Sequence, residues 1–274
     1  IGEWSPIKDK ALLPKDRSEY KPNKTPMINR QEVSRLLDHL TPRNNEDIKS
    51  IQKYVCISTL AFLGLRMSEL IALKWSNVNL DTGRWEVSNT IVYGHYSKSV
   101  KADGSERNNL LPNELWKILK AWKIVHNKHF GKSCEWLFPS FSYYNVAITE
   151  KAVRDWLVLA YQDLGLAKVE IRRSKSGDNK AYLKVLYSKF KGGPSKTFRH
   201  FASTALMSQQ KADPVILNDN FIKDYIGHTD IKMTRHYADH NNLDEEALGQ
   251  SDKERTALDQ AIRINTTDKW KELN

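Results

Sequence analysis

The segment that most constrains the fold is a helix predicted from about Asp47 to Leu63, whose later turns are apolar on every side. A helix without a polar face has to be buried by other elements, so this one is expected to cross the core. Gly64 is expected to end it, because glycine is common just past a helix C-terminus. A preceding helix is predicted to begin after Asn29, which can form a capping box with Glu32.

Arg66 follows this helix closely and lies within an apolar stretch. A guanidinium in such surroundings has to be paired or has to face a polar cavity, because an isolated buried charge is very costly. Glu69, three residues later, is available as its partner. Two interpretations stay open: a purely structural Arg–Glu pair near a helix start, or a pair that belongs to a functional site.

The rest of the chain is predicted to be mostly helical with a small antiparallel sheet, which is an α+β fold. A third helix is expected from Met67 to Trp75, and strand-like segments follow at 85–87, 90–93 and 107–111. The polar residues between the last two segments are expected to form a long hairpin that bears lysines. Further helices are expected at about 113–127, at 149–164, around Arg199, before Gly227 and in part of the tail.

Charge is unevenly distributed along the 274 residues, which carry a formal net charge of +10. Residues 168–200 hold ten Lys or Arg against two acids, a net +8, whereas residues 239–274 hold five against nine, a net −4. Residues 168–195, the basic segment, are interpreted as an inserted loop or hairpin that follows a nucleic-acid backbone, with a solubilising basic surface as the alternative. Its candidate DNA-binding residues are Arg172, Arg173, Lys175, Lys189 and Lys191.

Cys56 and Cys134 are the only two cysteines, and they lie far apart without a metal-ligand spacing. They are interpreted as ordinary thiols of a reducing compartment. Neither a metal site nor a cofactor is expected. The longest apolar run, residues 55–65, is too short to span a bilayer, so no membrane association is expected. The chain begins at Ile1 rather than Met and is interpreted as a fragment.

A histidine and a tyrosine stand nine residues apart near the end of the chain. A helix is predicted to end at Gly227, which would present His228 at a break between helices. Thr229 or Asp230 can cap a second short helix that carries Tyr237 about two turns along. His228 and Tyr237 could then face one site. The alternative is an amphipathic helix pair with a core tyrosine and a surface histidine.

Three stretches in series resemble the signature boxes of the tyrosine recombinases, the phage-integrase family. Gly64-Leu65-Arg66-Met67-Ser68-Glu69-Leu70 matches the first box, and Gly227-His228 with Tyr237 nine residues after the histidine matches the third. The second box is represented by Lys196-Thr197-Phe198-Arg199-His200, where Lys196 takes the place of the family's histidine. Order and spacing agree over roughly residues 27–245. The resemblance implies a helical catalytic domain with a small three-stranded antiparallel sheet.

Arginine suits a phosphate clamp because its guanidinium can hold two oxygens in a fixed fork and stays protonated. Arg66 and Arg199 are the candidates for this clamp, and His228 can donate to the same phosphate. The resemblance implies that Tyr237 is the nucleophile, which forms a 3′-phosphotyrosyl DNA intermediate. It also implies that Glu69 supports the site without reacting.

The general acid implied by the family lies in the sheet hairpin ahead of a Ser-x-Arg stretch. Lys101, before Ser105-Glu106-Arg107, fits this position best, and Lys98 is the alternative. Lys196 can still donate to a phosphate, but a lysine is a weaker proton acceptor than histidine at neutral pH. It is therefore a catalytic candidate without an assigned role as general base.

The resemblance implies site-specific recombination or integration of a mobile genetic element, without a metal. The expected partner is double-stranded DNA at an attachment site, bound by a homotetramer of the full-length protein in the bacterial cytoplasm and on the nucleoid while acting. Residues 1–26 are expected to be a linker or the end of a missing N-terminal core-binding domain, 27–245 the catalytic domain and 246–274 a partly helical tail. The alternatives are a type IB topoisomerase and a non-catalytic DNA-binding module.

Overall fold

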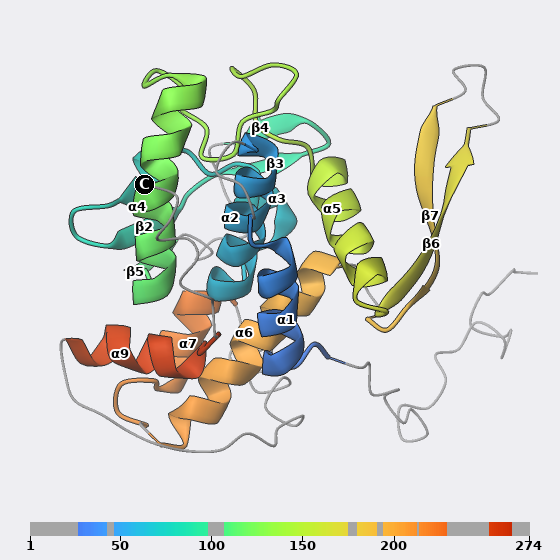
Figure 1. Cartoon of the computed structure of the whole chain (residues 1–274). Coiled ribbons are helices and arrows are strands. Elements are labelled where there is room, and N and C mark those ends of the chain that lie inside the picture. The colour runs from blue at the N-terminus through green and yellow to red at the C-terminus, as the bar shows by residue number, and fades with distance from the viewer. Residues whose placement is uncertain are drawn as a thin grey trace, which may run out of the picture.

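A computed structural model describes residues 27–42, 47–97, 107–174, 180–190, 194–212, 214–228 and 252–264 (Figure 1). Helices make up most of this part of the chain, and short antiparallel strands lie beside them, as the sequence predicts. The α-helices are α1 (Arg30–Leu40), α2 (Ile48–Leu63), α3 (Met67–Leu70), α4 (Asn113–Phe130), α5 (Glu150–Asp163), α6 (Pro194–Gln210), α7 (Asp219–Ile226) and α9 (Asp252–Ala261).

Helix α2 crosses the centre of the fold, where α1, α4, α5 and α6 pack against it (Figure 1). From Tyr54 to Leu63 every residue of α2 is buried, which confirms the prediction of a core helix. Gly64 ends the helix in the left-handed conformation, with φ 57°. A Cβ placed on Gly64 would lie 2.9 Å from the Cβ of Ala202 on α6, so this turn needs both the conformation and the small size of glycine.

The start of α1 confirms the predicted capping box. The Asn29 side chain accepts a hydrogen bond from the Glu32 amide at 2.9 Å, and the Glu32 carboxylate accepts one from the Asn29 amide at 3.0 Å. Helix α3, in contrast, is shorter than the predicted Met67–Trp75. The chain leaves the helix and pairs with the segment around Leu137, whose amide donates to the Leu73 carbonyl at 2.9 Å. A 3₁₀ turn, η4 (Trp75–Asn77), follows.

The predicted three-stranded antiparallel sheet is present, with the order β1-β2-β5. Its strands are β1 (Val78–Asn79), β2 (Arg84–Val87) and β5 (Arg107–Leu110). The strand-like segment at 90–93 does not join this sheet. Strand β3 (Thr90–Val92) pairs instead with β4 (His95–Ser97). Tyr93 and Gly94 both have positive φ, at 51° and 80°, which is the geometry of a tight two-residue hairpin turn.

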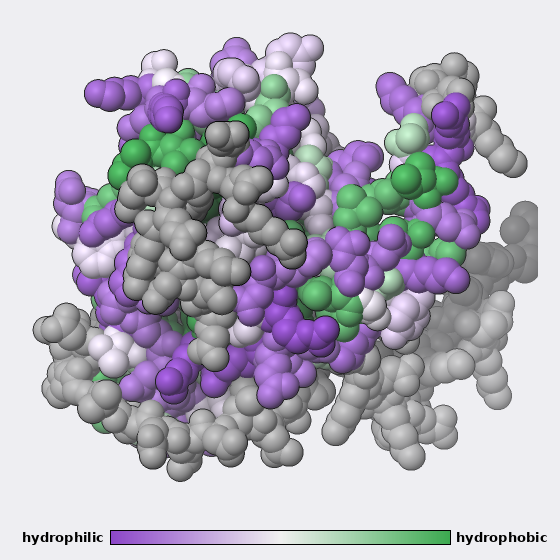
Figure 2. Space-filling model, viewed as in Figure 1, coloured by the Kyte–Doolittle hydropathy of each residue, from purple (hydrophilic) through white to green (hydrophobic). Residues whose placement is uncertain are grey.

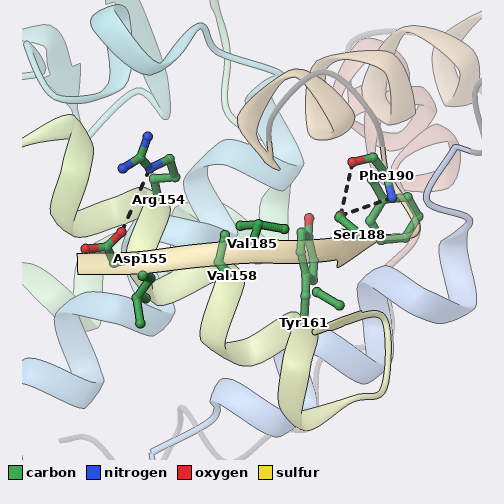
Figure 3. A pocket seen from close by; sticks show the side chains of 9 residues that line it. Arg154, Asp155, Val158, Tyr161, Val185, Ser188 and Phe190 are labelled. Atoms are coloured by element: carbon green, nitrogen blue, oxygen red, sulfur yellow. Dashed lines mark hydrogen bonds and ion pairs between the residues drawn. The ribbon is translucent and has the colours of Figure 1, made fainter. Parts of the chain in front are cut away.

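The basic segment forms the predicted hairpin, from β6 (Ala167–Arg173) and β7 (Ala181–Ser188). It stands out from the helical body next to α5 (Figure 1). Apolar side chains such as Ile171 and Val185 are exposed on it among hydrophilic ones (Figure 2). A cavity of about 290 Å³ separates the hairpin from α5, where Val158 and Tyr161 face Val185 (Figure 3).

Both cysteines are free thiols, and burial raises the pKa of each. Among the described residues, no group of His, Cys, Asp and Glu has the arrangement of a metal site. Within the same residues, no helix combines the length and the apolar character needed to cross a membrane.

Candidate active site

Arg66 sits at the junction of α2 and α3, held in place by Glu69. Its backbone amide donates to one Glu69 carboxylate oxygen at 2.9 Å, and its Nη1 donates to the other at 2.5 Å. Glu69 is 1% exposed, whereas the Arg66 side chain is 32% exposed. The carboxylate therefore fixes both the backbone and the guanidinium of Arg66, whose side chain remains partly exposed. The ion pair that the sequence predicts is present.

Arg199 approaches the same junction from α6. It is 8% exposed, and the neighbouring Thr197 and Phe198 are buried and anchor the start of the helix. Its Nη1 donates to the Gly64 carbonyl at 3.2 Å, and its Nη2 donates to the Gly227 carbonyl at 3.0 Å. Arg199 thereby joins the end of α2 to the end of α7.

His228 is presented at the end of α7, as the sequence predicts. Asn218 caps the start of this helix by accepting from the Phe221 amide at 3.0 Å. Gly227 ends it with φ 71°, and the amides of Gly227 and His228 both donate to the Lys223 carbonyl, at 2.8 and 2.9 Å. His228 is 1% exposed, so its ring lies inside the molecule, directly after Gly227 in the chain.

The two arginines meet on one oxygen atom. The Gly227 carbonyl accepts from Arg66 Nη2 at 3.2 Å and from Arg199 Nη2 at 3.0 Å. Taken together, these two guanidinium groups and the Glu69 carboxylate sum to a charge of +1 (2 − 1), and both Glu69 and Arg199 are buried. Two guanidinium groups placed together are suited to bind an anionic ligand through two oxygens, such as a phosphate diester with its two non-bridging oxygens.

Some of the other predicted residues belong to the described part of the chain, and the rest do not. Lys196 lies on α6, one turn before Arg199, and is exposed. Arg172, Arg173 and Lys189 belong to the hairpin and its base. Tyr237, Lys101, Lys98, Lys175 and Lys191 lie outside the described residues.

Two hairpin cations are engaged within the chain. Arg172 pairs with Glu170, with Nη2 at 2.9 Å from the carboxylate. Lys189 Nζ lies 2.5 Å from Glu32, which ties the base of the hairpin to the start of α1.

The hairpin strands carry two further lysines, Lys168 and Lys184, that the sequence analysis does not name as candidates. Residues opposite each other in antiparallel strands point to the same face, and side chains alternate between faces along each strand. Lys184 lies opposite Glu170, and Arg172 lies opposite Tyr182. Arg172 and Lys184 therefore share one face of the hairpin, whereas a register shift in the strand pairing separates Lys168 from this pattern.

Comparisons with known proteins agree with these features. The sequence model of the phage integrase family matches residues 26–243. No curated protein gave a match.

Solved structures share the fold at low sequence identity. XerA recombinase matches with 20% identity and a TM-score of 0.53, over 81% of this chain and 62% of that one. The integrase of transposon Tn1549, solved with transposon right end DNA, matches with 16% identity and a TM-score of 0.57, over 83% and 66%. XerH recombinase, solved with a difH substrate after cleavage, matches with 16% identity and a TM-score of 0.53, over 82% and 51%. The chain thus spans between half and two thirds of each.

Proposed function

Because the chain belongs to the phage integrase family, we propose that it carries the catalytic domain of a tyrosine-type, site-specific DNA recombinase. The proposed role is the recombination or integration of a mobile genetic element. The observation that carries this proposal is the meeting of Arg66 and Arg199 on one carbonyl oxygen beside His228. Two guanidinium groups from segments distant in the sequence bind the same oxygen, and the histidine follows that carbonyl directly in the chain.

The proposed clamp stabilises the charge that develops during attack on a phosphodiester. Attack builds negative charge on the non-bridging oxygens, and fixed donors aimed at that charge lower the barrier. Arg66 and Arg199 supply positive charge with fork geometry, and His228 donates a further hydrogen bond. Glu69 keeps Arg66 oriented without touching the reacting atoms. Positioning and fixed charge thus carry the reaction.

Tyr237 is the proposed nucleophile. Its hydroxyl gives up a proton to water, its oxygen forms a bond to phosphorus, the bond from phosphorus to the 5′-oxygen breaks, and Lys101 or Lys98 gives a proton to that oxygen. The 3′-phosphotyrosyl bond retains the energy of the broken diester, so another 5′-hydroxyl can rejoin the strand without ATP. Lys196 is proposed to donate to the phosphate, because an ammonium that is protonated at neutral pH is a weak proton acceptor.

Double-stranded DNA with a specific attachment site is the proposed partner. The hairpin cations and the net charge of +10 favour a polyanion. The Tn1549 integrase and XerH were both solved as DNA complexes. A homotetramer of the full-length protein, acting on the bacterial nucleoid in the cytoplasm, is proposed by analogy with family members. Residues 27–245 are the proposed catalytic domain.

Covalent capture tests the proposal. A nicked suicide substrate, from which the short 5′-ended piece diffuses away after cleavage, should trap the protein on DNA in a denaturing gel. Tyr237→Phe should bind the substrate as well as wild type and give no adduct. An adduct on another residue would move the nucleophile, and DNA binding without any adduct would favour a non-catalytic module. Relaxation of supercoiled DNA without strand exchange by the full-length protein would favour a topoisomerase.

A further inference from the structure

A cavity of about 440 Å³ has several lysines in its lining and includes neither Arg66 nor Arg199. It opens between η4, the β3–β4 hairpin, α4 and the loop that follows α4. Lys74, Trp75 and Ser76, which follow α3, form one wall. Asn89, just before β3, and Tyr96 of β4 form a second wall. Its lining residues are Lys74, Trp75, Ser76, Asn89, Tyr96, Lys123, Lys132, Ser133, Cys134 and Glu135. This cavity is called the lysine–aromatic pocket below.

Cations outnumber acids in the pocket, with three lysines against one glutamate, a net +2 (3 − 1). The single acid, Glu135, is already engaged, because its carboxylate lies 2.5 Å from Lys74 Nζ. Lys74 is further held over the ring of Tyr96, 5.1 Å from the centroid. The charge of Lys123 and Lys132 is therefore not neutralised by Glu135.

Of the three lysines, Lys123 gives the clearest indication of an anion site. Its Nζ lies 4.0 Å from the centroid of the Trp75 ring. Burial lowers the pKa of Lys123, which means that its charged form lacks the stabilisation that water gives it elsewhere. Within the described part of the chain, Lys123 forms no ion pair. An anion beside Lys123 would stabilise its charged form, which burial destabilises.

The remaining polar groups of the pocket also favour an anion. Ser76 and Ser133 carry hydroxyl groups and Asn89 carries an amide, all of which can donate hydrogen bonds. A phosphate diester has acceptors only, so it complements this set of donors.

We propose that the lysine–aromatic pocket binds a backbone phosphate of duplex DNA, separate from the phosphate that Arg66 and Arg199 hold. This inference rests on the proposed function. The pocket includes Asn89 and Tyr96, which flank and form part of the β3–β4 hairpin, and the chain runs directly from Ser97 into residues 98–106. Those residues contain both candidate acids, Lys98 and Lys101. Lys98 follows Ser97 directly in the chain, so DNA cleaved with the help of Lys98 would lie near this hairpin and its pocket.

The test compares two lysines of the same helix in a Tyr237→Phe chain, so that cleavage does not disturb the binding measurement. Lys123→Gln removes a charge inside the pocket, and Lys128→Gln removes one at an exposed position of α4 outside it. Affinity for a short linear duplex is measured over a series of salt concentrations. A lost phosphate contact lowers the slope of log affinity against log salt by about 0.9, which is roughly 3.5-fold less loss of affinity over a fourfold rise in salt. That change is expected for Lys123→Gln and not for Lys128→Gln.

Equal slopes for the two variants, or no measurable duplex binding by the parent chain, would overturn this inference. Titration with inorganic phosphate alone separates the two sources of the anion. Saturable phosphate binding that Lys123→Gln abolishes, without a change in the DNA slope, would assign the pocket to a free anion and reject the DNA assignment. The proposed function fails separately, if wild type forms no adduct on the suicide substrate while the difference in slope is still observed.

Discussion

Glu69 is the residue on which the geometry of the candidate site depends most. It is almost completely buried and binds both the amide and the guanidinium of Arg66. Arg66 in turn reaches the Gly227 carbonyl, which Arg199 also binds. A buried carboxylate with this role orients a charge for a ligand without contacting the ligand, so its loss should misplace Arg66 as well as weaken the fold.

Glu69→Ala is therefore expected to lower the free energy of unfolding by about 2–4 kcal/mol, because it leaves the Arg66 donors without their buried partner. Single-turnover cleavage at saturating DNA should also slow. Glu69→Gln should lose less in both measurements, since its amide oxygen can still accept one of the two hydrogen bonds. Denaturant unfolding and adduct formation on the suicide substrate measure the two effects. Unchanged stability and cleavage in the alanine variant would show that the pair does not position Arg66.

At the scale of elements, the site is made by three helix ends. Helix α2 is capped by Gly64, α7 is capped by Gly227, and Arg199 lies in the second turn of α6. The tightest of these contacts is between Gly64 and α6. A Cβ at Gly64 would lie 2.9 Å from Ala202 and 3.2 Å from Ile226. The approach of α6 and α7 to the end of α2 therefore depends on this glycine.

Gly64→Ala should destabilise the fold by about 2–4 kcal/mol, from the left-handed conformation and the overpacking together. Gly94→Ala is the matched control. Its φ is 80°, and nothing lies within 4 Å of the added Cβ, so only the conformational cost of about 1–2 kcal/mol applies. Thermal or urea unfolding gives both values. Equal losses in the two variants would mean that α6 and α2 do not approach as closely as described.

Sequence patterns predicted which helices and strands are present better than they predicted the lengths of these elements and the segments they pair with. The apolar run of α2, the Asn29 cap and the glycines at 64 and 227 are local signals, and each prediction was confirmed. The length of α3 was not predictable locally, because the chain leaves the helix to pair Leu73 with Leu137, far away in sequence.

The candidate site was predictable only in part. The Arg66–Glu69 pair follows from a spacing of three residues. The shared Gly227 carbonyl and the lysine–aromatic pocket follow from packing between distant segments, which no local pattern reports. The roles of Tyr237 and Lys101 remain predictions.

At the scale of the whole molecule, the C-terminal helix α9 packs back onto the body. Arg255 donates to the Thr82 carbonyl at 3.1 Å, and Arg30 donates to the Ala261 carbonyl at 2.9 Å. Asp259 accepts from the amide and from the side chain of Asn113, both at 2.6 Å, at the start of α4. Residues from the two ends of the described chain thus meet, and Asp259 is the titratable group at this contact.

Burial raises the pKa of Asp259 to about 6, from an ordinary value of 3.8, although the Asn113 hydrogen bonds lower it. The folded state therefore binds a proton more tightly than the unfolded state. The contribution of this group to stability is fully present below about pH 4 and is lost as the pH rises through 6. The stability of Asp259→Asn relative to wild type should rise between pH 4 and 7, since asparagine does not ionise. Unfolding curves at several pH values measure this difference, and a difference that is flat with pH, or that falls, would contradict the assignment.

The most direct test of the central claim concerns the charge on the cleaved phosphate. If Arg66 and Arg199 neutralise the negative charge shared by its non-bridging oxygens, a methylphosphonate at the cleavage position, which is uncharged, should need them less. Arg66→Ala is expected to slow cleavage of the ordinary phosphate by roughly 10²–10³-fold, the usual effect of removing one such donor. The defect should be much smaller on the methylphosphonate, and Arg199→Ala should behave alike. The hairpin control Arg172→Ala should respond equally to both substrates. An Arg66→Ala defect of the same size on both would contradict the proposed clamp.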